Sequence, residues 1–380
     1  MPPRPFTISV PQDVLDDLAA RLTRTRWPTS IPGSGWDYGA DVLAVKDLCD
    51  YWRNGYNWRQ HEGALNRFPQ FVTNVDGVDI HFWHVRGKGP NPLPLLLIHG
   101  WPGSIIEFLA LIEPLTNPAA LGGDQAHSFD VVVPALPGFG FSGKPTQRGW
   151  GITRIAAAFD RLMSEELGYG RYGVQGGDWG GIISSKMASA YPERVVAAHL
   201  NFAIGVPPEP MTPADEDWLK QRNAFQAAET GYSAIQGTKP MSLAVAQSDS
   251  PAGLAAWVVE KFRAWSDCAG EVENAFSRDV LLTNLMFYWA PNSVASSARI
   301  YYEAQRDPGA FRYPRVETPT AFAVFPKEPW RAPRSWLEPR YNIRRWTEMP
   351  RGGHFAALEQ PELLLRDVRE FFSEFRVPSS

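Results

Sequence analysis

A carboxylate stands at the centre of a glycine cluster in the middle of the chain. The segment reads Gly176-Gly177-Asp178-Trp179-Gly180-Gly181 and lies between a predicted strand and a predicted helix. Small residues on both sides of a central nucleophile are typical of a nucleophile elbow, a strained turn where strand and helix pack too closely for side chains. The alternative is a phosphate cradle, but a carboxylate repels phosphate and the G-x-G-x-x-G spacing is missing. We therefore predict that Asp178 is a nucleophile.

The second group with suitable chemistry is a histidine near the end of the chain. In proteins with such an elbow the nucleophile, an acid and a histidine follow one another in that order. Of the seven histidines only His354 lies beyond residue 199, and two glycines precede it in Arg351-Gly352-Gly353-His354-Phe355. A lone loop histidine is more often a solvent-exposed bystander, but its chain order and its place after the last predicted strand favour function. We predict that His354 is a general base.

A carboxylate must hold the histidine ring and stabilise its protonated form, and its expected place is the end of the preceding strand. The predicted strand Thr320 to Phe325 runs into Pro326-Lys327-Glu328, so Glu328 is the predicted partner. Glu338 and Glu348 are the rivals. Glu338 sits in the middle of a loop and Glu348 lies only six residues before the histidine, so we interpret both as surface groups.

A motif at the end of an earlier predicted strand could stabilise an oxyanion. It reads His99-Gly100-Trp101-Pro102. In proteins with the elbow, one backbone N–H of this loop and one from the residue after the nucleophile form the oxyanion hole. The sequence therefore predicts backbone donors at Trp101 and Trp179. For His99 we favour a structural role in bracing the loop over a catalytic one.

An aspartate at the elbow implies a different reaction from the more familiar serine. A serine makes acyl enzymes from esters and amides, whereas a carboxylate displaces a leaving group at saturated carbon and becomes an alkyl ester. Water deprotonated by His354 then attacks the Asp178 carbonyl, and the oxyanion hole holds the tetrahedral intermediate. Two substrate classes suit this chemistry: epoxides, whose alkoxide must be protonated, and haloalkanes, whose halide must be solvated.

The elements that must position these groups form a pattern of buried strands alternating with helices. Short apolar strands are predicted at Leu95 to Ile98, Phe129 to Val133, Tyr172 to Gln175, Val195 to Leu200, Thr320 to Phe325 and Asn342 to Thr347. Helices are predicted from Thr153, as an N-cap, to Gly168, through Ile182 to Met187, and from Pro361 to Phe375. Such alternation is typical of an α/β protein with a mostly parallel, doubly wound sheet.

Two further regions precede and interrupt this sheet. Residues 1 to about 70 form a helical lead-in, with helices predicted at Val14 to Leu22 and from about Asp41 to Leu65, and a hairpin then turns at Asp76-Gly77. From about 205 to 315, helical stretches without a convincing strand indicate an insertion. We predict an N-terminal helical extension with the first hairpin at 1–88, the two parts of the core at 89–204 and 316–380, and a helical cap at 205–315.

Composition restricts the classes of protein and partner. The chain has 380 residues, of which 44% are hydrophobic and 21% charged, and its formal net charge of -4 provides no positive field to gather nucleic acid. Cys49 and Cys268 lack a metal-type spacing, and no run of about 18 apolar residues suggests a membrane anchor. We expect no cofactor, no metal, no nucleic acid, no membrane anchor and a cytoplasmic location. The composition is compatible with a homo-oligomer.

With these motifs in place, the sequence resembles the epoxide hydrolases of the α/β-hydrolase fold, of the microsomal type with an N-terminal helical extension. The resemblance spans nearly the whole chain. It rests on Trp27-Pro28, Trp36 to Gly39, Phe68 to Phe71, His99 to Ser104, Gly176 to Gly181, Gly231-Tyr232, Lys239-Pro240, Gly253 to Ala256, Phe325 to Glu328 and Gly352 to Ala357. It implies an epoxide substrate, with Asp178 as nucleophile and Glu328 with His354 as the charge-relay pair.

The resemblance also implies two cap tyrosines that activate the epoxide. Tyr232, in Gly231-Tyr232, and Tyr301, in Ser297 to Glu303, fall at the matching places, although Tyr302 adjoins the second. A phenol with a pKa of about 10 stays protonated at neutral pH and can donate to a developing alkoxide. Without the resemblance, any single tyrosine is more often a residue at the rim of a core.

Two other functions fit part of this pattern. A haloalkane dehalogenase would share the Asp elbow and, in that family, would use the indole N–H of Trp179 to bind halide, but it would not need two cap tyrosines. A non-enzymatic small-molecule-binding homologue usually shows a broken set of catalytic groups. Asp178, Glu328 and His354 are all present.

Overall fold

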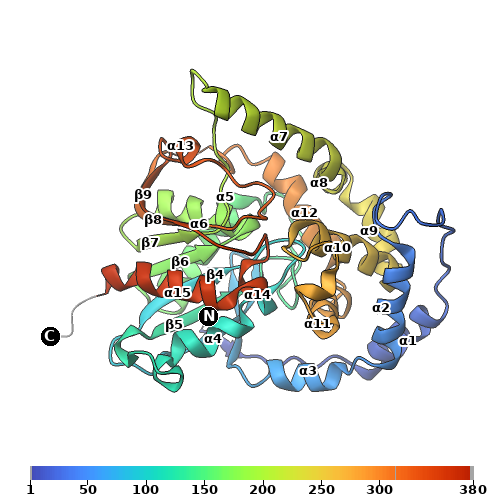
Figure 1. The fold of residues 1–380 in the computed structure, drawn as a ribbon. Helices are drawn as coiled ribbons and strands as arrows, with labels where there is room; N and C mark the ends of the chain where they lie inside the picture. The colour runs from blue at the N-terminus through green and yellow to red at the C-terminus, as the bar shows by residue number, and fades with distance from the viewer. Residues whose placement is uncertain (1, 313, 377–380) are drawn as a thin grey trace.

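Nine strands form one sheet at the centre of the molecule (Figure 1). The computed structural model describes residues 2–312 and 314–376. The order across the sheet is β1-β2-β3-β5-β4-β6-β7-β8-β9. The strands are β1 (Arg4–Pro5), β2 (Gln70–Val75), β3 (Val78–Val85), β4 (Leu93–Ile98), β5 (Phe129–Pro134), β6 (Tyr172–Gly176), β7 (Val195–Leu200), β8 (Val316–Val324) and β9 (Tyr341–Glu348).

The sheet is parallel from β5 to β9 and antiparallel at its other edge. Strand β4 pairs in parallel with β5 and β6, and β6, β7, β8 and β9 continue in the same direction. Strands β1, β2 and β3 join by antiparallel pairing, and β3 pairs antiparallel with β5. The apolar run Leu95 to Ile98 is fully buried, as expected for a strand covered on both faces. The predicted strands and the mostly parallel sheet are confirmed.

Helices cover both faces of this sheet. Figure 1 shows α5 (Ile152–Arg161) and α6 (Asp178–Ala190) on one face, and α4 (Leu109–Thr116) with α15 (Pro361–Phe372) on the other. Two short helices, α13 (Arg334–Leu337) and α14 (Ala356–Glu359), belong to the loops near the end of the chain.

The start of α5 differs from the prediction. Gly151 occupies the N-cap position, so the prediction that Thr153 caps this helix is wrong. The Thr153 hydroxyl instead donates a hydrogen bond to Asp307 Oδ1 at 3.0 Å. Beyond α5 the chain makes a π-helical turn, Leu162–Glu166, and Gly168 follows with a positive φ of 75°. The side chain of Thr153 therefore ties α5 to a distant segment rather than to its own helix.

The N-terminal region also departs from the prediction. The helix predicted from about Asp41 to Leu65 is two helices, α2 (Val42–Asn54) and α3 (Trp58–Leu65), because Asn57 caps the second one by accepting from the Gln60 N–H. The predicted helical lead-in, residues 1 to about 70, also contains a strand, since the short β1 pairs with β2 at the edge of the sheet. Helix α1 (Gln12–Thr23) and the hairpin of β2 and β3 are as predicted.

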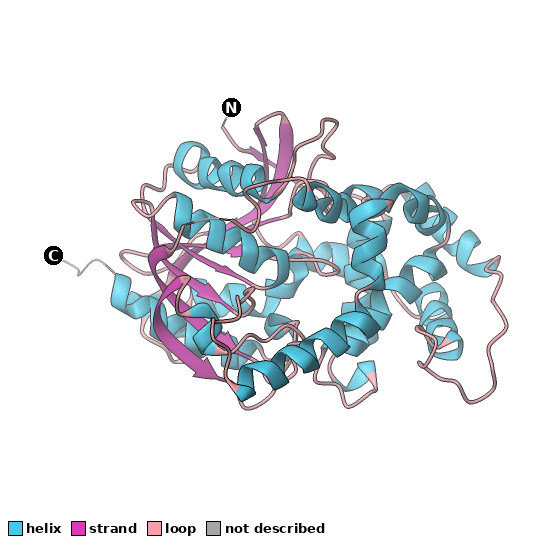
Figure 2. Cartoon of the chain, turned by 90° about the horizontal axis from the view of Figure 1, so that it is seen from above, coloured by secondary structure: helices cyan, strands magenta, loops and turns pink. Residues whose placement is uncertain are grey.

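The stretch between β7 and β8 is helical, and its described residues contain no strand. Its helices are α7 (Pro213–Glu229), α8 (Gly231–Thr238), α9 (Pro240–Asp249), α10 (Pro251–Trp265), α11 (Arg278–Trp289) and α12 (Val294–Gln305). Figure 2 shows the strands toward one side of the molecule and only helices and loops toward the other, where Figure 1 places α1, α2, α9, α10 and α11. No helix in the described part of the chain is long and apolar enough to cross a membrane.

The N-terminal helices pack directly against the inserted ones. Helix α2 contacts α10 and α11, and α1 contacts α10. The Tyr51 hydroxyl donates to Asp279 Oδ1 at 2.7 Å, and the hydroxyls of Tyr56 and Thr283 are 3.0 Å apart. The extension therefore supports the insertion from the side remote from the strands.

Candidate active site

Asp178 lies at a sharp turn between β6 and α6. It is one of four described residues other than glycine with positive φ, at 48°, and it is the first residue of α6. The turn brings α6 against β4 so closely that a Cβ atom at Gly180 would lie 1.8 Å from the Ile98 carbonyl oxygen. No side chain fits there, which is the physical reason for the glycines around Asp178. The geometry is that of the predicted elbow.

The two carboxylate oxygens of Asp178 face different partners. Its Oδ1 accepts a hydrogen bond from the backbone N–H of Trp101 at 2.8 Å. Its Oδ2 lies 3.4 Å from Nε2 of His354. The relative solvent exposure of the Asp178 side chain is 17%, whereas that of the His354 side chain is 2%. The carboxylate is thus fixed by a donor on one side and a histidine on the other.

His354 is held by the predicted glutamate. Its Nδ1 lies 2.8 Å from Glu328 Oε2, and both side chains are buried. The other oxygen of Glu328 accepts from the backbone N–H of Trp330 at 3.0 Å. Glu338 and Glu348, the rival carboxylates, are exposed, and Glu338 accepts from Arg334 on the surface. The structure therefore brings Glu328, and neither rival, to the histidine.

The charges around His354 determine its protonation. Burial alone would lower its pKa, but the carboxylates of Glu328 and Asp178 outweigh burial and raise the pKa of His354 well above its ordinary value. An imidazolium between two carboxylates is the resting form that this arrangement favours.

The loop after β4 is braced by His99. Its Nε2 accepts from the backbone N–H of Leu136 at 3.1 Å and its Nδ1 lies 2.9 Å from the Gly100 carbonyl oxygen. Burial lowers the pKa of His99 to about 4, so the ring is neutral and suited to one accepted and one donated bond. These contacts fit the structural role favoured for His99. Trp101 and Trp179 are the predicted oxyanion donors, and Trp179 lies in the first turn of α6, where N–H groups have no helical partner.

Tyr232 and Tyr301 both lie against the tryptophans beside Asp178. The Tyr232 ring stacks on Trp101 at 5.0 Å between centroids with 7° between planes. The Tyr301 ring meets Trp179 edge-on at 4.8 Å, and the two tyrosine rings are 5.6 Å apart. Helices α8 and α12, which carry them, are in contact. The inserted helices therefore place both predicted phenols against the two tryptophans next to Asp178.

Both phenols are buried and protonated. Burial raises the pKa of Tyr232 and of Tyr301 far above the ordinary value, and the negative charge of Asp178 raises both further. The Tyr301 hydroxyl has no hydrogen-bond partner among the described residues. Tyr302 is only half-buried, points to a different cavity, and its ring lies under Arg306. Of these two tyrosines, Tyr301 is therefore the one that lies among the buried rings beside Asp178.

One carboxyl group near the centre was not predicted. Glu107, in the 3-10 turn Ile105–Phe108, lines a small pocket of about 10 Å³ together with Asp178, Asn201 and His354. Burial raises the pKa of Glu107 to about 8; the Asp178 charge adds to that rise and the His354 charge opposes it. The sequence did contain a signal: Glu107 stands among the apolar residues Ile105, Ile106 and Phe108, shortly after the His99 motif. Three apolar neighbours, all of them buried, indicate a buried segment rather than a surface loop.

The described residues contain no cluster of three or more His, Cys, Asp or Glu side chains that could hold a metal ion. The groups assembled here are the carboxylate of Asp178, an imidazole with its own carboxylate partner, backbone N–H groups and two phenols. In such a set the carboxylate can attack a strained or activated carbon of a substrate and become an ester. The imidazole can then activate water to hydrolyse that ester.

Comparison with known proteins first defines the class. Residues 94–298 match the family described as the alpha/beta hydrolase fold, and residues 3–108 match the family described as the epoxide hydrolase N terminus. The crystal structure of juvenile hormone epoxide hydrolase from the silkworm Bombyx mori superposes with a TM-score of 0.89 at 31% identity, covering 98% of this chain and 95% of that one. The predicted α/β-hydrolase fold is confirmed.

Sequence relatives then define the family. A putative epoxide hydrolase of Stigmatella aurantiaca is 45% identical over 378 residues, which cover 98% of this chain and 85% of that protein. Epoxide hydrolase 1 of Oryctolagus cuniculus is 37% identical over 402 residues, covering 97% of this chain and 88% of the rabbit protein. The chain belongs to the epoxide hydrolase family, as the sequence motifs predicted.

Proposed function

We propose that this epoxide hydrolase adds water to an epoxide through a covalent alkyl ester on Asp178, giving a vicinal diol. The observation that carries the proposal is the meeting of two buried phenols with a carboxylate nucleophile that already has a histidine at 3.4 Å. A carboxylate alone suits several leaving groups. Paired phenol donors suit a leaving group that remains attached to the substrate as an alkoxide.

In the first step an Asp178 oxygen attacks one epoxide carbon and the C–O bond at that carbon breaks. The electron pair moves to the epoxide oxygen, to which Tyr232 and Tyr301 donate hydrogen bonds. Their raised pKa keeps both protonated, so they stabilise the alkoxide without losing their protons to solvent. The Tyr301 hydroxyl, which lacks a protein partner, gains one when the substrate oxygen arrives.

Alkylation also changes the charge beside His354. The ester is neutral, so one of the two carboxylates that raise the pKa of His354 disappears, and the imidazolium can release its proton to the alkoxide. The first step thereby produces the neutral imidazole that the second step needs. Glu328 keeps the ring oriented through its bond to Nδ1.

In the second step His354 takes a proton from water while the hydroxide adds to the Asp178 carbonyl carbon. The backbone N–H groups of Trp101 and Trp179 stabilise the tetrahedral oxyanion. The intermediate then expels the diol oxygen, which takes the proton from His354, and the Asp178 carboxylic acid returns its proton to the imidazole. The small pocket beside His354 has room for about one water, and Glu107 and Asn201 line it. We infer that Glu107 positions this water.

We infer that 205–315 acts as the cap, that 1–88 supports it, and that 89–204 with 316–380 forms the catalytic core. Contacts of α2 with α10 and α11 support this division. A cytoplasmic location agrees with two buried cysteines that form no disulfide. A homo-oligomer remains compatible with the chain.

The experiment that tests the proposal is incubation with a panel of aryl and alkyl epoxides and with matched haloalkanes. Diol detected by mass, without halide release, is the expected result. Halide release without diol would mean that the same nucleophile carries out dehalogenation. Absence of both products from a folded protein would favour a binding role.

A further inference from the structure

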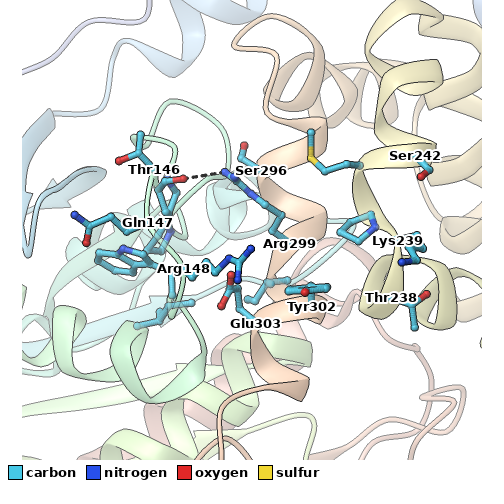
Figure 3. Close-up of a pocket in the computed structure, with 17 residues that line it drawn as sticks. Thr146, Gln147, Arg148, Thr238, Lys239, Ser242, Ser296, Arg299, Tyr302 and Glu303 are labelled. Carbon is cyan, nitrogen blue, oxygen red and sulfur yellow. Dashed lines mark hydrogen bonds between the residues drawn. The ribbon is translucent and has the colours of Figure 1, made fainter.

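A second and larger cavity lies between the core and the inserted helices (Figure 3). Its volume is about 380 Å³, within the range of small-molecule sites. Three segments surround it: the loop between β5 and α5, the turn between α8 and α9, and one side of α12. It shares no lining residue with the pocket that contains Asp178 and His354. We call it the seam cavity.

The seam cavity combines an apolar lining with cationic side chains. Pro137, Ile155 and Ile300 contribute apolar surface. Arg148 and Lys239 also line the cavity, and Figure 3 shows them on opposite sides of it. Such a lining suits a ligand with an apolar body and a negative charge.

The cavity's positive charges are not neutralised by the protein. Neither Arg148 nor Lys239 forms an ion pair with any described residue, and Arg299 donates to the carbonyl oxygen of Pro145 at 3.1 Å rather than to a carboxylate. The carboxylate in the lining, that of Glu303, accepts from the Gly149 N–H at 2.8 Å. Three cations against one acidic group leave a net positive cavity.

We propose that the seam cavity binds an organic anion with an apolar body, such as a medium-chain carboxylate. The positive charge of Arg148, Lys239 and Arg299 would attract its carboxylate, and its chain would cover the apolar lining. The bound anion would replace water at three unpaired cations while removing apolar surface from solvent.

An occupant of this cavity would touch both helices that carry the phenols. Thr238 ends α8, six residues after Tyr232, and Ile300 and Tyr302 flank Tyr301 on α12. Any displacement of these helices on binding would therefore reach the donor pair, and epoxide binding would affect the anion reciprocally. This link, unlike the binding itself, rests on the proposed function.

Isothermal titration of the full chain with decanoate, below its micelle concentration, tests the site. We expect decanoate to bind, decanol to bind roughly tenfold more weakly, and added salt to weaken decanoate alone. The double variant Arg148→Gln, Lys239→Gln should lose roughly tenfold in decanoate affinity and keep its affinity for decanol. Both side chains are exposed and form no hydrogen bond or ion pair with the described residues, so the fold should survive. Lys220→Gln, on the exposed side of α7, is the matched control and should leave both affinities unchanged.

Kinetics separate this cavity from the catalytic pocket. If decanoate occupies the seam cavity, any change in the KM for an epoxide should level off once the cavity is saturated, whereas competition at the catalytic pocket would raise KM without limit as decanoate is added. Absent decanoate binding, equal binding of decanol, unchanged affinity in the double variant, or simple competition with the epoxide would each overturn the proposal. Failure of every epoxide to yield diol would refute the proposed function instead, and the titration would still decide the cavity.

Discussion

The core side and the cap side of the proposed active site hold their functional groups in different ways. On the core side Asp178, Glu328 and His354 follow the ends of β6, β8 and β9, and hydrogen bonds of 2.8 Å fix each of them. On the cap side Tyr232 and Tyr301 project from helices and are held by ring packing, with the Tyr301 hydroxyl left without a partner.

This difference assigns the two sides to different moments of the reaction. The core-side groups are already fixed by hydrogen bonds before a substrate arrives. They are therefore preorganised for ester hydrolysis, in which negative charge develops on the Asp178 carbonyl oxygen. A buried phenol without an acceptor stabilises charge that the substrate itself brings. Changes to His354 or Glu328 should therefore arrest the reaction at the ester, and changes on the cap side should slow formation of the ester.

The largest effect is expected from His354→Gln. This variant keeps the nucleophile and both phenols, so it should consume about one equivalent of epoxide and then stall as an ester on Asp178. Steady-state diol formation should fall by roughly 10³-fold, because a general base is lost from the slow step. Intact-protein mass after epoxide treatment measures the adduct, and Asp178→Asn is the control that should form none. A folded His354→Gln protein without any adduct would break the division between the two sides.

A smaller effect is expected from the phenols. Tyr232→Phe and Tyr301→Phe should each slow alkylation by roughly 100-fold, by analogy with removal of one oxyanion donor, and the double variant should be nearly inert. Rapid-quench measurement of ester formation gives the rate directly. Tyr302→Phe is the matched control, since this neighbouring ring faces the seam cavity, and it should keep the parental rate. Parental rates in both single variants would remove the phenols from the mechanism.

The smallest effect concerns Glu107, which belongs to the core side without touching the nucleophile. Glu107→Gln should leave alkylation unchanged and slow ester hydrolysis roughly tenfold, the worth of one hydrogen bond to the water. Single-turnover rates of the two steps separate these outcomes. Equal slowing of both steps would mean that Glu107 supports the site only structurally.

Glu107 also predicts a pH dependence of stability. Its pKa is raised in the folded state, from 4.5 to about 8, so the folded protein holds this proton more tightly than the unfolded chain does. The resulting stability is fully present below the unfolded pKa and is lost as the pH rises through about 8. Between pH 5 and 9 the parent should therefore lose on the order of 4 kcal/mol of stability relative to Glu107→Gln. Urea unfolding measures the difference, and the exposed Glu216→Gln should show none; identical curves for Glu107→Gln and the parent would contradict the raised pKa.

Sequence patterns predicted the core side better than the cap side because its signals are local. Glycines around Asp178 reflect a contact of α6 with Ile98 that leaves no room for a Cβ, and this requirement is visible in the sequence. Tyr232 and Tyr301 meet only through packing of α8 against α12, so their pairing needed a family resemblance.

Four other features escaped prediction, and three of them depend on contacts that no local pattern records. The break between α2 and α3 had a local signal, the capping residue Asn57, but the long apolar periodicity hid it. The strand β1 contains proline and only two residues, and it exists because β2 offers an edge to pair with. Thr153 prefers a distant carboxylate, that of Asp307, over capping its own helix. Glu107 acquires its character only when burial places it beside His354.

The most direct test of the covalent mechanism is a single turnover in heavy-oxygen water with enzyme in excess over epoxide. The account predicts that the label enters the Asp178 carboxylate, detected by mass of the peptide that contains it, and that the first diol carries none, because its new oxygen comes from the enzyme. Label in the first diol, with an unlabelled Asp178, would mean that water attacks the epoxide directly and would contradict the covalent ester.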